Sequence, residues 1–67
     1  MQKFYVTKKK YDWIVRCDDE EFGLAEERED AIETARARAR DVVAKGGEAE
    51  VYVVNTVGMW DRVQIDG

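Results

Sequence analysis

Hydrophobic and polar positions alternate in the first part of the chain, which is typical of half-buried strands. One β-prone run covers residues 4–7, and a second covers residues 11–17. Lys8, Lys9 and Lys10 carry the turn between them, so the two runs predict an antiparallel hairpin. Residues 18–21 predict a polar turn, and residues 22–25 predict a short third strand or an irregular lead-in. One face of the second strand would carry Tyr11, Trp13, Val15 and Cys17.

From residue 27 onward the apolar positions follow a helical period. The positions on one stripe are Ala31, Ile32, Ala35, Ala39, Val42 and Val43. Acidic residues fill the first half of this segment and basic residues the second, which suits the helix macrodipole. Gly46-Gly47 marks its end, whereas no Ser, Thr or Asn before Glu27 marks its start. We therefore predict a helix over residues 27–45.

Strand periodicity returns after the helix. Residues 48–54 alternate Val51 and Val53 with Tyr52 and Val54, and residues 55–58 predict a hairpin loop. Residues 59–65 predict the last strand, whose register stays open. In one alternative Trp60, Arg62 and Gln64 share a face, and in the other a bulge near Gly58 turns Trp60 and Val63 inward.

The predicted order is β-β-(β)-α-β-β, in one domain covering residues 1–67. Hairpins segregated around one helix favour an α+β two-layer sandwich, with the helix packed on an antiparallel sheet. A helix of this length spans roughly 28 Å at 1.5 Å per residue, which is enough to cross four strands.

Several segments also resemble a known family. Trp13-Ile14-Val15-Arg16 is similar to its Trp-x-Val strand, residues 29–35 to its Ala-Ile helix start, and residues 46–51 to its glycine-ended helix and acidic-aliphatic strand. The terminal Gly67 also fits. The chain thus resembles the small prokaryotic family catalogued as domain of unknown function 2188 over nearly its whole length. It departs from that pattern in having no glycine at residues 10–12, no Thr before the helix and no histidine at residues 52–55. The resemblance implies a fold and neither an activity nor functional residues.

Composition narrows the possible functions. The chain has 67 residues, a single cysteine and no histidine, so it has no intramolecular disulfide and lacks the commonest zinc ligand. A chain this short buries only about 60% of its unfolded surface, which favours self-association. No apolar run approaches a membrane span and no signal-peptide core is present, so we expect a cytoplasmic protein without a membrane partner.

The residues for familiar catalytic sites are missing. Without histidine, neither a Ser-His-Asp nor a Cys-His arrangement can form. The glycines do not form a phosphate-binding loop, because Gly46-Gly47 follows a helix instead of opening one. The acidic residues lack the spacing of a calcium loop. Cys17 shares a strand face with Trp13 and Val15, so we expect it to be a buried structural thiol. We therefore expect a protein that is not an enzyme and uses no cofactor or metal.

The leading hypothesis is a protein-interaction module that forms a homo-oligomer or binds another protein. If the predicted registers hold, the sheet face away from the helix carries more apolar residues than a solvent-exposed face should. These residues are Tyr5, Ile14, Tyr52 and Val54. A register shift of one residue would turn every one of them to the other face.

Two further surfaces give alternative functions. Acidic residues before and at the helix start could mimic phosphates, as in a small inhibitor, such as one encoded by a phage, that blocks a nucleic-acid-binding complex. The same pattern is also explained by a solvated turn followed by a helix start whose acidic residues interact favourably with the helix dipole. The residues are Asp18, Asp19, Glu20, Glu21, Glu26, Glu27, Glu29 and Asp30.

The other surface is basic and could bind nucleic acid weakly. A net charge of −4 disfavours that function, and a solvated helix face explains the arginines equally well. The residues are Lys8, Lys9, Lys10, Arg36 and Arg40.

Overall fold

The computed structural model describes residues 1–65, and Gly67 of the family pattern lies outside the described residues. The N-terminal part folds as a three-stranded antiparallel meander of β1 (Gln2–Lys9), β2 (Asp12–Cys17) and β3 (Glu20–Ala25). The optional third strand is therefore present. Both turns are shorter than predicted, because left-handed backbone at Lys10 (φ 59°) and Asp18 (φ 56°) reverses the chain tightly. The lysine run and the acidic run thus lie partly within strands.

The predicted helix is confirmed as α1 (Arg28–Ala44), flanked by Glu27 and Lys45 as caps. Glu27 makes no side-chain capping hydrogen bond, as expected from a sequence with no capping residue there. At the other end Gly46 adopts a φ of 88°, and the Gly47 amide donates to the Val42 carbonyl at 2.9 Å. These contacts satisfy carbonyls that the end of a helix leaves free.

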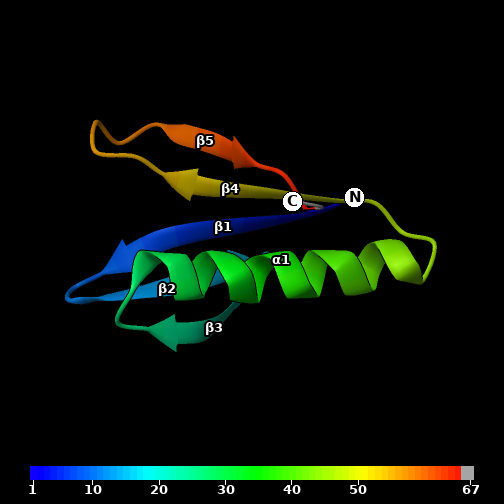
Figure 1. Ribbon diagram of the computed structural model, residues 1–67, viewed down its shortest axis with the longest axis horizontal. Helices are drawn as coiled ribbons and strands as arrows, with labels where there is room; N and C mark the ends of the chain where they lie inside the picture. Colours follow the sequence, from blue (N-terminus) through cyan, green and yellow to red (C-terminus); the bar gives the residue numbers. More distant parts are fainter. Residues whose placement is uncertain (66–67) are drawn as a thin grey trace.

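The last two strands are β4 (Ala49–Val54) and β5 (Trp60–Val63). They complete a five-stranded sheet in the order β3-β2-β1-β4-β5, with α1 packed across one face (Figure 1). The sheet is antiparallel except at its centre, where β1 and β4 run parallel. The predicted α+β sandwich is confirmed. Its sheet is antiparallel as predicted except at this pair, because the helix is a crossover that returns the chain beside β1 in the same direction.

The core lies between α1 and the sheet. Alanines at three helix positions let the backbone approach the sheet closely, and β-branched residues fill the space beneath them. The buried cluster contains Phe4, Val6, Val15, Cys17, Ala31, Ile32, Ala35, Ala39, Val51 and Val53. Val43, predicted on the apolar stripe, is 49% exposed. The stripe therefore ends with Val42, which packs against the cluster.

The register of β5 follows from its pairing with β4. Val54 pairs with Trp60, Tyr52 with Arg62, and Val51 with Val63. Trp60 and Arg62 therefore share the face opposite α1, and Val63 points into the core. The first of the two predicted registers is confirmed for Trp60 and Arg62, whereas Gln64 lies beyond the end of β5. No helix in the described part of the chain is long and apolar enough to cross a membrane.

Candidate interaction surface on the sheet

The sheet face opposite α1, called the far face here, brings together all the residues predicted for it. Tyr5 pairs with Arg16 on β2 and with Tyr52 on β4, so residues two positions along these strands also share the face. Ile14 and Val54 occupy such positions. Ile14 is only 4% exposed, so it forms the floor of the surface, whereas Tyr5, Tyr52 and Val54 are half-buried.

Three aromatic side chains form the centre of the far face. The rings of Tyr5 and Tyr52 stack, with centroids 5.6 Å apart and planes 18° from parallel. Trp60 meets Tyr5 edge to face, with centroids 5.1 Å apart. Trp60 is 47% exposed and was missing from the predicted surface, because the sequence left the register of its strand open. We call Tyr5, Tyr52 and Trp60 the aromatic cluster.

Charged residues surround the aromatic cluster in pairs. On one side Glu21 accepts a hydrogen bond from Lys9 Nζ at 2.8 Å and lies 3.6 Å from Arg16 Nε. These cations, with the Lys9 hydrogen bond foremost, lower the pKa of the Glu21 carboxyl below its usual value. On the other side Arg62 Nη1 lies 3.5 Å from Glu50 Oε2. The rim of the surface therefore carries both signs of charge.

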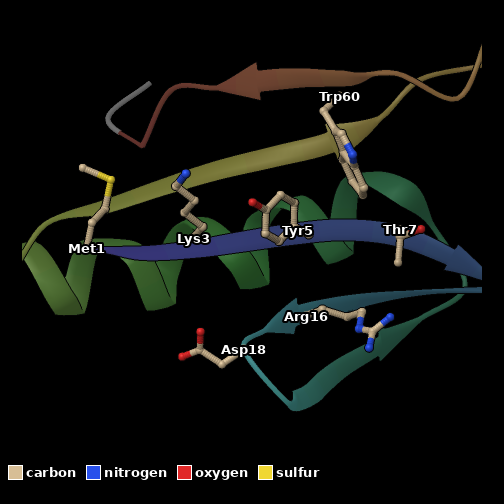
Figure 2. Close-up of a pocket in the computed structure, with 7 residues that line it drawn as sticks. All are labelled: Met1, Lys3, Tyr5, Thr7, Arg16, Asp18 and Trp60. Atoms are coloured by element: carbon tan, nitrogen blue, oxygen red, sulfur yellow. The ribbon is translucent and has the colours of Figure 1, made fainter.

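A shallow hollow of about 590 Å³ lies beside the aromatic cluster (Figure 2). Figure 2 shows Tyr5 in the middle of the residues that line it, with Trp60 above, Lys3 to the left, and Arg16 and Asp18 below. No ion pair of Lys3 or Asp18 is found among the described residues. The full lining is Met1, Lys3, Tyr5, Thr7, Arg16, Asp18 and Trp60.

The structure divides the predicted acidic patch into two groups. Asp18 and Asp19 form the turn between β2 and β3, and Glu20 and Glu21 begin β3. The second group follows the other end of β3, roughly 20 Å away for a six-residue strand at 3.3 Å per residue. That group contains Glu26, Glu27, Glu29 and Asp30. All of these carboxylates are exposed, and the two groups do not form one continuous surface.

The predicted basic residues are engaged within the chain. Lys8 Nζ lies 5.6 Å from the centroid of the Trp13 ring, and Lys9 binds Glu21. Arg36 Nη1 binds Glu33 at 2.8 Å, and its side chain is only 17% exposed. Arg40 Nη1 donates to the backbone carbonyl of Ile65 at 3.2 Å, and Lys10 is exposed in the β1–β2 turn. These contacts do not gather the side chains into one basic face.

Cys17 is buried between the sheet and the helix, as predicted. Burial raises the pKa of its thiol, and the nearby carboxylates of Asp18 and Glu20 add to the effect. A raised pKa reduces the thiolate fraction near neutral pH, so this cysteine is poorly suited to nucleophilic chemistry. Among residues 1–65, no group of three or more His, Cys, Asp or Glu is placed to hold a metal ion.

Comparison with known proteins adds no relative. A scan against protein-family models, a search of curated proteins and a search of solved structures each found no match to the chain. The resemblance to domain of unknown function 2188 stays a prediction.

Proposed function

We propose that the chain is a non-enzymatic protein-interaction module that self-associates through the far face of its sheet. The observation that supports this most is the aromatic cluster, which no element of the described chain covers. Contiguous exposed apolar surface marks interaction sites, and Tyr and Trp are enriched in the centres of such sites.

The size of the protein supports the same proposal. In the described chain one helix covers one face of the sheet, and on the other face Tyr5 and Tyr52 stay half-buried and Trp60 stays 47% exposed. Small domains without disulfides or metals gain stability when they oligomerise. Packing a second copy on the aromatic cluster would bury that surface without a different protein as partner.

The structure gives less support to the acidic inhibitor and the nucleic-acid binder. The acidic residues lie in two separate groups, and most of the predicted basic residues already contact other parts of the chain. By contrast, Tyr5 contacts both Tyr52 and Trp60 on one surface.

Sedimentation equilibrium over a range of micromolar concentrations tests the proposal. We expect the native chain to sediment with a mass well above 7.8 kDa. Trp60→Lys should return it to the monomer mass, because a buried ammonium in the interface has no partner. Tyr11→Lys is the matched control, since Tyr11 is 91% exposed and lies in the β1–β2 turn. Circular dichroism verifies the fold of both variants. A native chain that stays at 7.8 kDa at every concentration contradicts the proposal.

A further inference from the structure

Resting on the proposed self-association, we infer that two copies pack far face to far face about a two-fold axis that runs along the strands between β1 and β4. A two-fold interface uses the same surface on both copies, so each contact occurs twice. This axis places β1 of one copy opposite β4 of the second copy, and β2 opposite β5. The two sheets then pack in the aligned way common to β-sandwiches.

The strand registers make the apolar residues of the two faces meet. Tyr5 pairs with Tyr52 across β1 and β4, so the axis sets Tyr5 of one copy against Tyr52 of the second copy. Two residues further along the strands, the far face carries a second row of register partners. In this row Thr7 on β1 pairs with Ile14 on β2, and Val54 on β4 pairs with Trp60 on β5. In this row Trp60 of the second copy lies over the position of Ile14, whose own side chain is only 4% exposed.

The charges of the far face fit the same axis. Lys3 and Glu50 are register partners on β1 and β4. The two-fold therefore sets Lys3 of each copy opposite Glu50 of the other, giving two pairs of opposite charge. The far face carries as many cations as carboxylates, although the whole chain has a net charge of −4. These charged residues are Lys3, Lys9, Asp12, Arg16, Asp18, Glu21, Glu50 and Arg62.

One contact about this axis brings like charges together, because Arg16 of one copy faces Arg62 of the second copy. Each guanidinium already has a carboxylate of its own chain beside it, Glu21 at 3.6 Å and Glu50 at 3.5 Å. Both arginines lie at the rim, with side chains 56% and 66% exposed, where solvent screens the repulsion.

An axis across the strands fits the surface less well. If that axis passed over Tyr5 and Tyr52, each residue would face a residue of the same strand in the second copy. The two residues would lie equally far from the axis, on opposite sides of it. Glu50 would then lie against Val54 of the second copy, and its carboxylate, already paired with Arg62 of its own chain, would gain no cation from the second copy. The axis along the strands instead sets the Glu50 carboxylate opposite the Lys3 ammonium of the second copy.

The overlapping surface is small. The extents of 34 × 22 × 20 Å include α1 and the loops. The four strands that overlap about this axis, β2, β1, β4 and β5, cover roughly 400 Å² before side-chain relief is added, below the about 800 Å² per partner of a standard interface.

Charge reversal at Lys3 and Glu50 tests the inference. Lys3→Glu and Glu50→Lys should each weaken self-association at least about tenfold, because both contacts then join like charges. An equimolar mixture of the two variants should regain the association, since every contact between the two chains then joins a glutamate to a lysine. Like-charge repulsion inside each chain persists in the mixture, so recovery reports the contact between copies. Sedimentation equilibrium measures each dissociation constant.

The double variant Lys3→Glu/Glu50→Lys gives a second test that does not depend on the single variants folding. It keeps opposite charges within the chain and should self-associate like the native protein. It should not pair with the native protein, because a mixed dimer would join two lysines at one contact and two glutamates at the other. Native mass spectrometry of the isotope-labelled mixture distinguishes the species. Statistical mixing of the two chains, or a single-variant mixture that stays monomeric while the native chain associates, overturns the two-fold arrangement. A native chain that never associates overturns the proposed function itself.

Discussion

The hydroxyl of Tyr52 donates a hydrogen bond of 2.9 Å to Oε1 of Glu50, two residues earlier on β4. Glu50 Oε2 faces Arg62 Nη1 at 3.5 Å, so the carboxylate is held from both sides. Its side chain is only 16% exposed. Glu50 therefore stands in a fixed position on the far face, next to the ring stack of Tyr52 and Tyr5.

Because of this hydrogen bond, the stability of the protein should fall at alkaline pH. Donation to Glu50, together with burial, raises the pKa of Tyr52 above its usual 10.0. The raised pKa means that the stabilising contribution is complete below pH 10 and is lost as pH rises through the folded-state pKa. We expect the melting temperature of the native chain to fall more steeply above pH 10 than that of Tyr52→Phe, which keeps the ring stack. Thermal melts from pH 8 to 11 measure it, and parallel curves for the two proteins would contradict it.

At acidic pH, protonation of Glu21 should lower the stability of the protein. The hydrogen bond from Lys9 lowers the pKa of Glu21 below its usual 4.5, so its contribution is present above pH 4.5 and is lost as pH falls through the folded-state pKa. The native chain should be slightly more stable than Glu21→Gln at pH 6, and this small advantage should disappear toward pH 3. The effect is small because both side chains are exposed. Urea denaturation at several pH values tests it, with Asp19→Asn as an exposed control in the adjacent turn. A constant difference between native chain and variant across this range would show that the pair is not responsible.

Gly23 is required where β3 passes under the helix. Its φ is 70°, and a Cβ at this position would lie 2.8 Å from Cγ2 of Thr34 on α1. Gly23→Ala should lower the free energy of unfolding by about 2–4 kcal/mol, through left-handed strain and the steric clash together.

Gly46→Ala isolates the first of these effects. Gly46 has a φ of 88°, but nothing lies within 4 Å of a Cβ there. This variant should lose only about 1–2 kcal/mol, the cost of the backbone conformation alone. Equal losses for the two variants in urea denaturation would mean that Thr34 moves aside without cost.

Ala35 sets the distance between the helix and the sheet. It is fully buried at the centre of the alanine stripe. Ala35→Leu should cost about 1–3 kcal/mol of stability, because the added methyl groups have no space beneath the helix. Ala37→Leu, on the exposed side of the same helix, should change stability by less than about 0.5 kcal/mol. Calorimetry of both variants compares them, and a neutral Ala35→Leu would show that the helix can lift from the sheet.

The local periodicity of apolar residues determined much of the secondary structure of this protein. The apolar stripe around Ala35 and the glycines at 46 and 47 indicated α1 to within one residue at each end, because helix propensity and helix termination depend on neighbours in sequence. The alternation of Val51 and Val53 with Tyr52 and Val54 likewise predicted which side chains of β4 face the helix. Side chains in a strand alternate between faces whatever the strand's partner is.

Tertiary structure alone decided which strands become neighbours. The parallel pairing of β1 with β4 depends on where the helix returns the chain, and no residue of either strand encodes its direction locally. That pairing brings Tyr5 beside Tyr52, and the pairing of β4 with β5 brings Trp60 against Tyr5. The extended strand β3, by contrast, is local structure, and it alone separates the two groups of acidic residues. The sequence thus specified the helix and the buried side of β4, whereas the register of β5 and the surface proposed for binding came from contacts between distant segments, which local propensity does not encode.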